Sequence, residues 1–463
     1  MKTRIHFIRR FFMKQGARKT QRMRRIFVAF MLLTVMAIPP VLGAGAREPV
    51  EVKEIRIAIN DSPWLPGFEK LADYYEELNP NVRLIFNVFP YAGLYEKLVT
   101  EIPAGSTEFD LILLDDTWVS LFYDRGYLTP LHEIESGFEP DPEIISYANV
   151  MRWNHEKRYT TEDGVLYTLP INGNFHLFYY RKDLYEEAGF STPPRTWDDV
   201  KQAAAALYDP AKPLYGYVLR GQRGNPVVFN FLPVLRSFGG DVLVDPPNDY
   251  RVRINDAAAH RALANYLELL TWTPPGSGDI GQSDMISLLA SGRALQGIVV
   301  AAGSAHMDNP DISAVPGKIH FSVTPRAADG QHAPLLGMWV MGIPNVISDE
   351  RKATTFEFMK WATSYEAQMK YVEFGAIPVR SDVMFSELAD QQQFRFLIGM
   401  GESYDLVTER PRMPEWFEME DIMGLHLNRA IIGEETPRQA LAAIERKIID
   451  LLRAEGYDTG SVR

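Results

Sequence analysis

The stretch that decides the fold is Tyr167–Val200, which reads YTLPINGNFHLFYYRKDLYEEAGFSTPPRTWDDV. Within it, Leu177–Tyr180 is a continuous apolar run of the length expected for a buried strand. The amides of Asn172 and Asn174 stand just before this run, where they have no apolar surface to cover. If the strand passes from one domain into another, these amides lie at the rim of a cleft between domains, where small ligands preferentially bind.

The segment before this stretch predicts an α/β fold. The segments Ile55–Ile59 and Asp110–Leu114, which are rich in apolar residues, and an alternating pattern over 82–88 predict three strands, with apolar residues at helical spacing between them. Such an order predicts a mostly parallel sheet that is covered by helices on both faces. Ligands bind beyond the carboxyl ends of strands in sheets of this kind, which points to the loops 60–64 and 115–118.

The central stretch resembles the family 1 extracellular solute-binding proteins, the substrate receptors of carbohydrate importers driven by ATP-binding cassettes. Its LFYYRKDLYEEAGFSTPPRTWDDV is similar to the family's apolar strand, Lys-Asp-Leu step, helix ending in Ala-Gly, and Pro-x-Thr-Trp-Asp. The resemblance spans about 50 to 455, and two of its segments look closest to members that bind polyols and small sugars. Those two segments read EFDLILLDDTWVSLFYDRGYLTPL and LRGQRGNPVVFNFLPVLRSFGGDVL, and the later ones read PLLGMWVMGIPNVISDERKATTFEFMKWATSYEAQMKYVEFGAIPVRSDV and RPRMPEWFEMEDIMGLHLNRAIIG.

This resemblance implies a two-lobed periplasmic-binding-protein fold of type II, like that of maltose-binding protein, with an interlobe cleft and a hinge. The apolar strand at 294–300 is similar to the family's return strand to the first lobe. We therefore expect a first lobe of 47–172 plus 292–346 and a second lobe of 173–291 plus 347–463.

The first residues have the pattern of a secretory signal peptide. Residues 1–25 carry ten Lys or Arg and no acidic residue, and the apolar run Ile26–Ile38 follows. Ala44-Gly45-Ala46 then offers a cleavage site of the small-x-small kind. These features predict a signal peptide over 1–46, or a shorter one if translation starts at Met13 or Met23.

Charge and cysteine content narrow the class of protein. No Cys is present for a lipid anchor at the cleavage point, so a protein free in the periplasm is expected. Without residues 1–46, 38 Lys and Arg stand against 60 Asp and Glu, a formal charge of -22. A surface this acidic repels nucleic acid and anionic lipid, so neither is expected as a partner.

The candidate binding residues are those that suit a carbohydrate. A sugar or polyol presents hydroxyl groups, which both donate and accept hydrogen bonds, and apolar C–H patches, which pack on aromatic rings. Residues with suitable side chains at predicted loop ends or in the family motifs are Trp64, Tyr91, Asp115, Trp118, Asn172, Asn174, Arg220, Asn225, Trp339 and Arg380. Each type also has an ordinary role, since tryptophans pack in cores, Asp115 and Asp116 can cap a helix, and Arg220 and Arg223 can form surface ion pairs.

Motifs for catalysis are absent from the sequence. It has no Gly-x-Ser-x-Gly, no Cys and no His-Glu-x-x-His, and its nine His are scattered, so no metal and no cofactor is expected. Gly276, Gly278 and Gly281 follow Pro274-Pro275 rather than a strand, which argues against a dinucleotide site. Two carboxylates about 5–10 Å apart could serve glycoside hydrolysis, but nothing in the sequence selects such a pair.

We therefore expect a monomeric periplasmic substrate-binding protein, not an enzyme, that delivers a sugar or sugar alcohol to the permease of an ABC importer. Within this class, an oligosaccharide or an acidic sugar is the alternative ligand. A secreted glycan-acting enzyme and a peptide-binding module are alternatives of other classes. The enzyme would turn its ligand over, and the peptide-binding module would need an exposed apolar groove.

Overall fold

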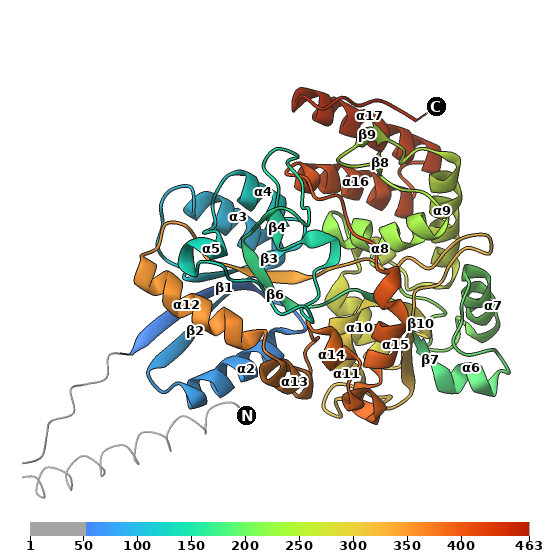
Figure 1. Ribbon diagram of the computed structural model, residues 1–463. Coiled ribbons are helices and arrows are strands. Elements are labelled where there is room, and N and C mark those ends of the chain that lie inside the picture. Colours follow the sequence, from blue (N-terminus) through green and yellow to red (C-terminus); the bar gives the residue numbers. More distant parts are fainter. Residues whose placement is uncertain (1–51, 463) are drawn as a thin grey trace, which may run out of the picture. The chain divides into compact units, whose positions relative to one another are not determined.

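The structure is a computed structural model that describes residues 52–462. The predicted signal peptide, 1–46, lies outside the described residues. Two β-sheets organise the described part, and helices cover both of them (Figure 1). No helix within 52–462 combines the length and the apolar character needed to cross a membrane.

The first sheet has five strands in the order β2-β1-β3-β12-β6. Strand β1 runs parallel to both β2 and β3, as the strand-helix alternation predicted, whereas β12 runs antiparallel to β3 and β6. All five residues of β3 are buried, which explains its unbroken apolar run. The strand bounds are β1 Lys53–Asn60, β2 Val82–Phe89, β3 Leu111–Asp115, β6 Thr168–Asn172 and β12 Trp339–Gly342.

Helices follow each parallel strand of this sheet. Helix α2 (Leu65–Leu78) follows β1, α3 (Tyr91–Glu101) follows β2, and α4 (Val119–Asp124) follows β3. Two later helices, α12 (Asp349–Ala362) and α13 (Tyr365–Glu373), also pack on this sheet, against β1 and α2 respectively (Figure 1). The predicted division placed both of them in the second lobe, whereas these contacts lie on the side of the five-stranded sheet.

The second sheet has three strands in the order β10-β7-β11, all antiparallel. Its central strand β7 (His176–Arg181) is the apolar run of the central stretch, and all six of its residues are buried. Both β10 (Gln296–Val300) and β11 (Ile319–Ser322) pair with β7, although 292–346 was expected to belong to the first lobe. Because every residue of β10 is buried, its sequence does not show which strand it pairs with. The strand that returns to the first sheet is β12.

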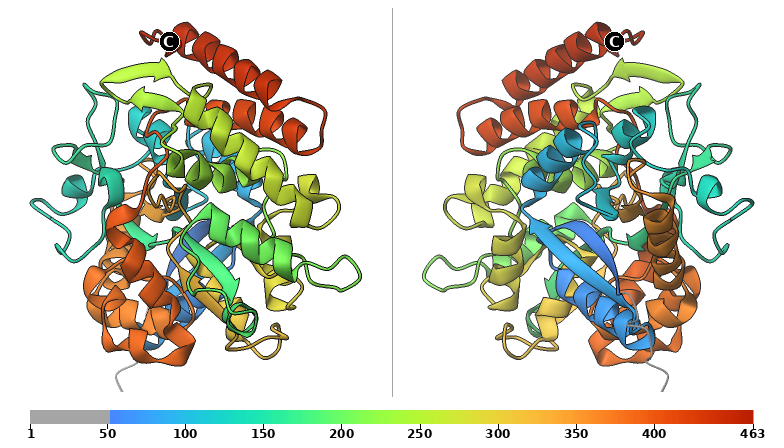
Figure 2. Two further views of the ribbon diagram at one scale, coloured as in Figure 1. Left: turned by 90° about the vertical axis from the view of Figure 1, so that its right-hand side faces the viewer. Right: turned by 90° about the vertical axis from the view of Figure 1, so that its left-hand side faces the viewer.

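The remaining helices pack around the second sheet and on one another. Helix α15 packs on β11 and β7, α16 packs on α8, and α17 lies over α16, as the two side views also show (Figure 2). Capping boxes at Thr196 and Thr436 begin α7 and α17. The bounds are α6 Lys182–Glu187, α7 Trp197–Leu207, α8 Asn225–Ser237, α9 Ala257–Glu268, α10 Gln282–Ala290, α11 Ser304–Asp308, α14 Ser381–Met384, α15 Phe396–Ser403, α16 Trp416–Ile431 and α17 Pro437–Ala454.

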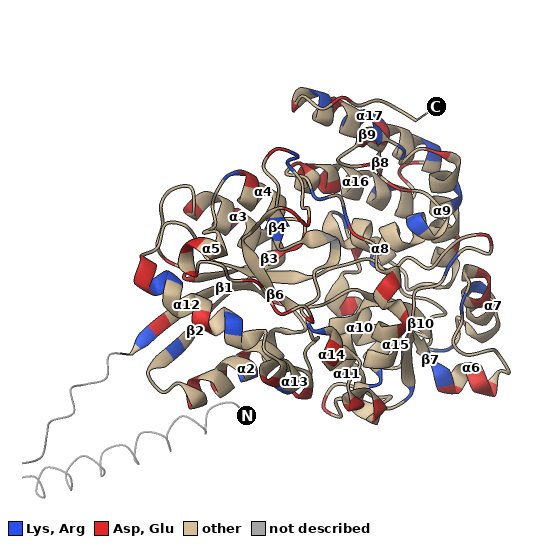
Figure 3. Ribbon diagram, viewed as in Figure 1, with Lys and Arg blue, Asp and Glu red and all other residues tan. Residues whose placement is uncertain are grey.

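Smaller elements complete the described part. Short β-hairpins pair β4 with β5 and β8 with β9, and α5 follows α4. Acidic and basic residues are interspersed along the outer helices rather than gathered by sign (Figure 3). The bounds are α5 Leu131–Ile134, β4 Arg152–Trp153, β5 Val165–Leu166, β8 Leu243–Asp245 and β9 Asp249–Val252.

Candidate functional site

A cavity of about 610 Å³ lies where loops from the two sheets meet. From the first sheet it is lined by the loop after β1, the start of α3 and the ends of β3 and β12. From the second sheet it is lined by the segment 220–229, the start of α10 and the end of β10. Its size falls within the range of about 300–1,000 Å³ that small-molecule sites occupy.

One side of the cavity is an aromatic wall, which we define as Trp64, Tyr91 and Trp339. The ring centroids of Trp64 and Trp339 are 6.0 Å apart, and those of Tyr91 and Trp339 are 6.1 Å apart. Behind them, the ring of Trp118 contacts Tyr91 at 4.8 Å and Trp339 at 5.4 Å. Because each ring is braced by another, the wall presents a fixed apolar surface to a ligand.

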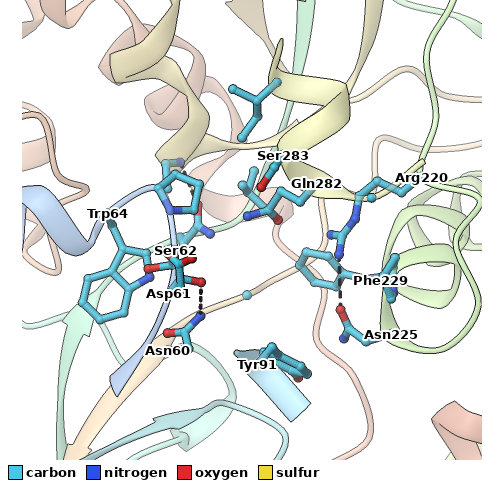
Figure 4. Close-up of a pocket in the computed structure, with 18 of the residues that line it drawn as sticks. Asn60, Asp61, Ser62, Trp64, Tyr91, Arg220, Asn225, Phe229, Gln282 and Ser283 are labelled. Carbon is cyan, nitrogen blue, oxygen red and sulfur yellow. Dashed lines mark hydrogen bonds between the residues drawn. The ribbon is translucent and has the colours of Figure 1, made fainter. Parts of the chain in front are cut away.

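The opposite side is an arginine wall, which we define as Arg220, Asn225, Phe229 and Arg410 (Figure 4). The guanidinium carbons of Arg220 and Arg410 lie 5.5 and 4.8 Å from the centre of the Phe229 ring. Arg220 is only 6% exposed, and its Nη2 donates to Asn225 Oδ1 at 3.4 Å. Its Nε and Nη1 have no hydrogen-bond partner among residues 52–462, so these donors are free for a ligand.

A cluster of buried ions supports this wall from behind. Arg410 Nη2 donates to Asp115 Oδ1 at 2.7 Å and also to Asp116, which in turn accepts from Arg412. Glu420 Oε1 lies 3.7 Å from Arg410 Nη1, beyond hydrogen-bond distance. Asp116, Arg410 and Arg412 are fully buried, so each charge depends on its neighbours for compensation.

Burial shifts the pKa of several groups in and around the cluster. It raises the pKa of Asp116 to about 6, although the nearby Arg410 and Arg412 act to lower it. It raises the pKa of Glu420 to about 7, again against the lowering effect of Arg410. Burial also lowers the pKa of Arg220 to about 10, which leaves the guanidinium protonated at neutral pH.

The loop after β1 and the start of α10 add polar groups that face the cavity (Figure 4). Asn60 Oδ1 and Ser62 Oγ are buried and have no partner in the described part of the chain. At α10, the backbone amide of Gly281 donates to Asp284 Oδ2 at 2.9 Å, which holds Gln282 and Ser283 at the start of the helix. Free acceptors thus lie on the side of the aromatic wall, and free donors lie on the arginine wall.

Seven of the ten predicted binding residues line the cavity, and Arg410, Phe229 and the start of α10 were missed. Arg410 lies in the RPRMPEW segment, where nothing in the sequence shows that it reaches Asp115, 295 positions away. Phe229 belongs to an apolar helix face and reads as core. The seven that line the cavity are Trp64, Tyr91, Asp115, Asn174, Arg220, Asn225 and Trp339.

The other three predicted residues do not line the cavity. Trp118 is 1% exposed and lies behind Tyr91. Asn172 is fully buried at the end of β6, opposite Trp339 in the sheet. Arg380 is held away from the cavity because its Nη2 donates to Asp382 at 2.7 Å and to Asp141 at 3.2 Å. Arg223 forms a surface ion pair, the alternative role expected for it, with Asp421 at 3.7 Å.

The family model for bacterial extracellular solute-binding proteins matches residues 62–369. The chain belongs to this family. The match begins in the loop after β1 and ends within α13, and therefore includes most of the residues that line the cavity. Members of the family bind solutes, so this solute-binding protein is a binding protein and not an enzyme.

Individual relatives agree with this assignment. A mannitol-binding protein of Pseudomonas aeruginosa is 25% identical over 70% of this chain and 71% of its own. A probable amino-acid ABC transporter periplasmic-binding protein of Sinorhizobium fredii is 25% identical over 79% of this chain and 82% of its own. Among solved structures, maltose-bound MalE3 of T. maritima matches with a TM-score of 0.76 and 25% identity, over 87% of this chain and 100% of that one. This likeness confirms the predicted type II fold of the solute-binding protein.

Proposed function

We propose that this protein captures a sugar or sugar alcohol in its cavity and delivers it to the membrane permease of an ABC importer. The observation that carries this proposal is that Arg220 presents two unpartnered donors across the cavity from the aromatic wall. The mannitol-binding relative and the maltose-bound structure support the same class of ligand. The protein would act in the periplasm, in line with the predicted signal peptide, and it would act as a monomer.

The two walls would make different kinds of contact with the ligand. The rings of Trp64 and Trp339 would pack on the C–H faces of the ligand, while Arg220 Nε and Nη1 donate to its hydroxyl oxygens. Asn60 Oδ1 and Ser62 Oγ would accept from hydroxyl groups at the other end. A hydroxyl group satisfies both sides because it donates and accepts, whereas a carboxylate only accepts.

Charge favours a neutral ligand over an acidic sugar. Of the two arginines that line the cavity, Arg410 is already paired with Asp115 and Asp116. Asp61 and Asp284 also line the cavity, and their negative charges would repel an anionic ligand. The volume of about 610 Å³ suits a small sugar or polyol, and a long oligosaccharide would have to extend beyond it.

Capture would proceed by closure of one lobe on the other. We propose a first lobe built on the five-stranded sheet with α12 and α13, and a second lobe built on the three-stranded sheet with α15 to α17. The chain passes between the sheets at 172–176, 322–339 and 373–396, and these passages would form the hinge. A ligand favours the closed state only if it contacts both lobes, which Trp64 and Arg220 together provide.

A thermal-shift panel tests the proposal. The chain without residues 1–46 would be freed of co-purified ligand and mixed with D-mannitol, ribitol, maltose, glucuronate and a set of amino acids. A ligand at a hundredfold excess over its Kd stabilises the folded state by about 2.7 kcal/mol, so a true ligand raises the Tm clearly. We expect a shift with a neutral sugar or polyol. Shifts with amino acids alone would refute the carbohydrate assignment and follow the Sinorhizobium fredii relative instead.

A further inference from the structure

One face of helix α16 contacts the binding loop 220–225 at three successive turns. Glu420, Gly424 and Asn428 follow one another at intervals of four residues, so they lie on the same side of the helix. None of the three lines the cavity, yet each touches a different residue of the loop that carries Arg220 and Asn225. We refer to Glu420, Gly424 and Asn428 as the α16 stripe.

Asn428 and Gly424 hold the backbone of the loop. Asn428 Nδ2 donates to the carbonyl oxygens of Gly221 and Gly278, at 2.8 Å in both cases. A Cβ atom on Gly424 would lie 2.5 Å from Cα and 2.6 Å from the backbone nitrogen of Gly224, so the two backbones are in direct contact. Gly224 itself has a φ of +89°, a conformation that glycine adopts without strain.

Glu420 acts on the side chains of the loop. Its Oε1 accepts a hydrogen bond of 3.0 Å from Asn225 Nδ2, which orients the amide so that Oδ1 faces Arg220. Arg220 Nη2 donates to that Oδ1, and the remaining donors Nε and Nη1 are left toward the cavity. The carboxylate of Glu420, which is 2% exposed, thus sets the direction of Arg220 through one intermediate side chain.

We propose that the α16 stripe positions Arg220 and Asn225 for ligand binding, and that Glu420, Gly424 and Asn428 determine affinity without touching the ligand. This inference rests on the proposed function for its ligand. The contacts between α16 and the loop do not depend on which ligand binds, so an experiment without ligand can test them.

Several charged groups face Glu420 and bear on its titration. Arg410 precedes α16, Asp115 and Asp116 stand at the end of β3, Tyr91 begins α3, and Arg220 belongs to the loop. When Glu420 is ionised, its bond from Asn225 is charge-assisted and holds the amide in one orientation. When Glu420 is protonated, its hydroxyl can donate to Asn225 Oδ1 instead, which would turn the amide away from Arg220.

The first experiment measures the loop without any ligand. Hydrogen–deuterium exchange of the amides of 221–228 would be compared in the wild type, Asn428→Ala and Glu420→Ala, with Glu418→Ala as the matched control. Glu418 is an exposed residue of the same helix that lies off the stripe. We expect these amides to exchange at least about tenfold faster in the two stripe variants and at the wild-type rate in the control. Equal rates in all four proteins would overturn the proposal.

The second experiment measures D-mannitol binding by calorimetry between pH 6 and pH 8. We expect Asn428→Ala and Glu420→Ala to weaken binding about tenfold. Wild-type affinity should fall as the pH is lowered, whereas Glu420→Gln, which keeps an acceptor but does not titrate, should bind within about threefold of the wild type at pH 8 and show no such fall toward pH 6. A purely structural role of Glu420 predicts the same pH profile for both proteins and would contradict the inference. If the wild type does not bind D-mannitol, the polyol assignment fails, and the exchange rates alone decide the role of the stripe.

Discussion

The two walls of the cavity are built by different means. The aromatic wall consists of rings that contact one another: Trp64 lies in the loop after β1, Tyr91 begins α3, and Trp339 begins β12. The arginine wall consists of cations stacked on Phe229 and backed by the buried carboxylates Asp115, Asp116 and Glu420. Apolar packing tolerates small changes because the rings remain in contact, whereas a buried ion that loses its partner leaves an uncompensated charge.

The surface that a ligand would contact and the direction of its hydrogen bonds are thus set by different parts of this site. In the proposed function, the aromatic wall would define the surface on which a ligand lies, and the arginine wall would define where hydrogen bonds point. Changes to the arginine wall should therefore cost more, in stability as well as in affinity, than comparable changes to the aromatic wall.

The largest effect is expected from Arg410→Met. The change leaves Asp115 and Asp116 buried with Arg412 as their remaining cation, and breaking a buried ion pair in this way costs about 3–5 kcal/mol. Urea unfolding at pH 7.5 would measure it. The control is Arg223→Met, which removes an exposed ion pair and should change the free energy of unfolding by less than about 0.5 kcal/mol. A similar result for both variants would mean that the buried cluster has no special role.

The next effect is a dependence of stability on pH. Burial raises the pKa of Glu420 from 4.5 to about 7, so the folded state keeps this proton to higher pH than the unfolded state. The folded state therefore loses stability as the pH rises from about 4.5 to 7, by on the order of 3 kcal/mol. In Glu420→Gln this loss is absent, so the variant should match the wild type near pH 5 and exceed it near pH 8. Parallel stability curves from urea unfolding at each pH would contradict the assignment.

A smaller effect, confined to affinity, is expected from Arg220→Gln. The variant removes hydrogen bonds from a charged donor, each worth about 1.5–3 kcal/mol, so ligand affinity should fall about 10- to 100-fold. Stability should hold, because Arg220 forms no ion pair with a carboxylate in the described residues. Calorimetric titration gives the Kd and thermal unfolding gives the Tm. A lower Tm with unchanged affinity would show that Arg220 supports the fold rather than the site.

The smallest effect is expected on the aromatic wall. Tyr91→Phe keeps the ring against Trp118 and Trp339 and removes only the hydroxyl that donates to Asp115 Oδ2 at 3.3 Å. Loss of one such bond costs about 0.5–1.5 kcal/mol, so affinity should fall less than about tenfold. The same titration measures it. If Tyr91→Phe weakened binding more than Arg220→Gln, the ranking of the two walls would be reversed.

The parts of the fold that the sequence predicts are those encoded locally. The strand-helix alternation, the position of Trp64 in the loop after β1 and the position of Asp115 at the end of β3 all depend on residues within a few positions of one another. These local signals predicted the parallel strands β1, β2 and β3 correctly, and they placed Trp64 in the loop that reaches the cavity.

The parts that the sequence does not predict depend on distant partners. The strand β10 is apolar on every side, so its pattern could not show that it pairs with β7 rather than with the first sheet. Arg410 and Glu420 read as ordinary charged residues near the start of α16, and only the folded chain brings them to Asp115 and Asn225. The sequence therefore predicted Arg220 and Asn225 of the arginine wall, but it did not predict Arg410 or the contact of Glu420 with Asn225.

The tryptophans of the site also have an optical consequence. Of the 8 Trp in the chain, Trp64, Trp118 and Trp339 form one contact network at the cavity, with Trp118 and Trp339 only 5.4 Å apart. Indole emission depends on the polarity around the ring, so a ligand that enters the cavity beside Trp64 and Trp339 changes the wavelength of the emitted light. The protein thus carries a built-in fluorescent reporter, and capture can be followed in real time without a label.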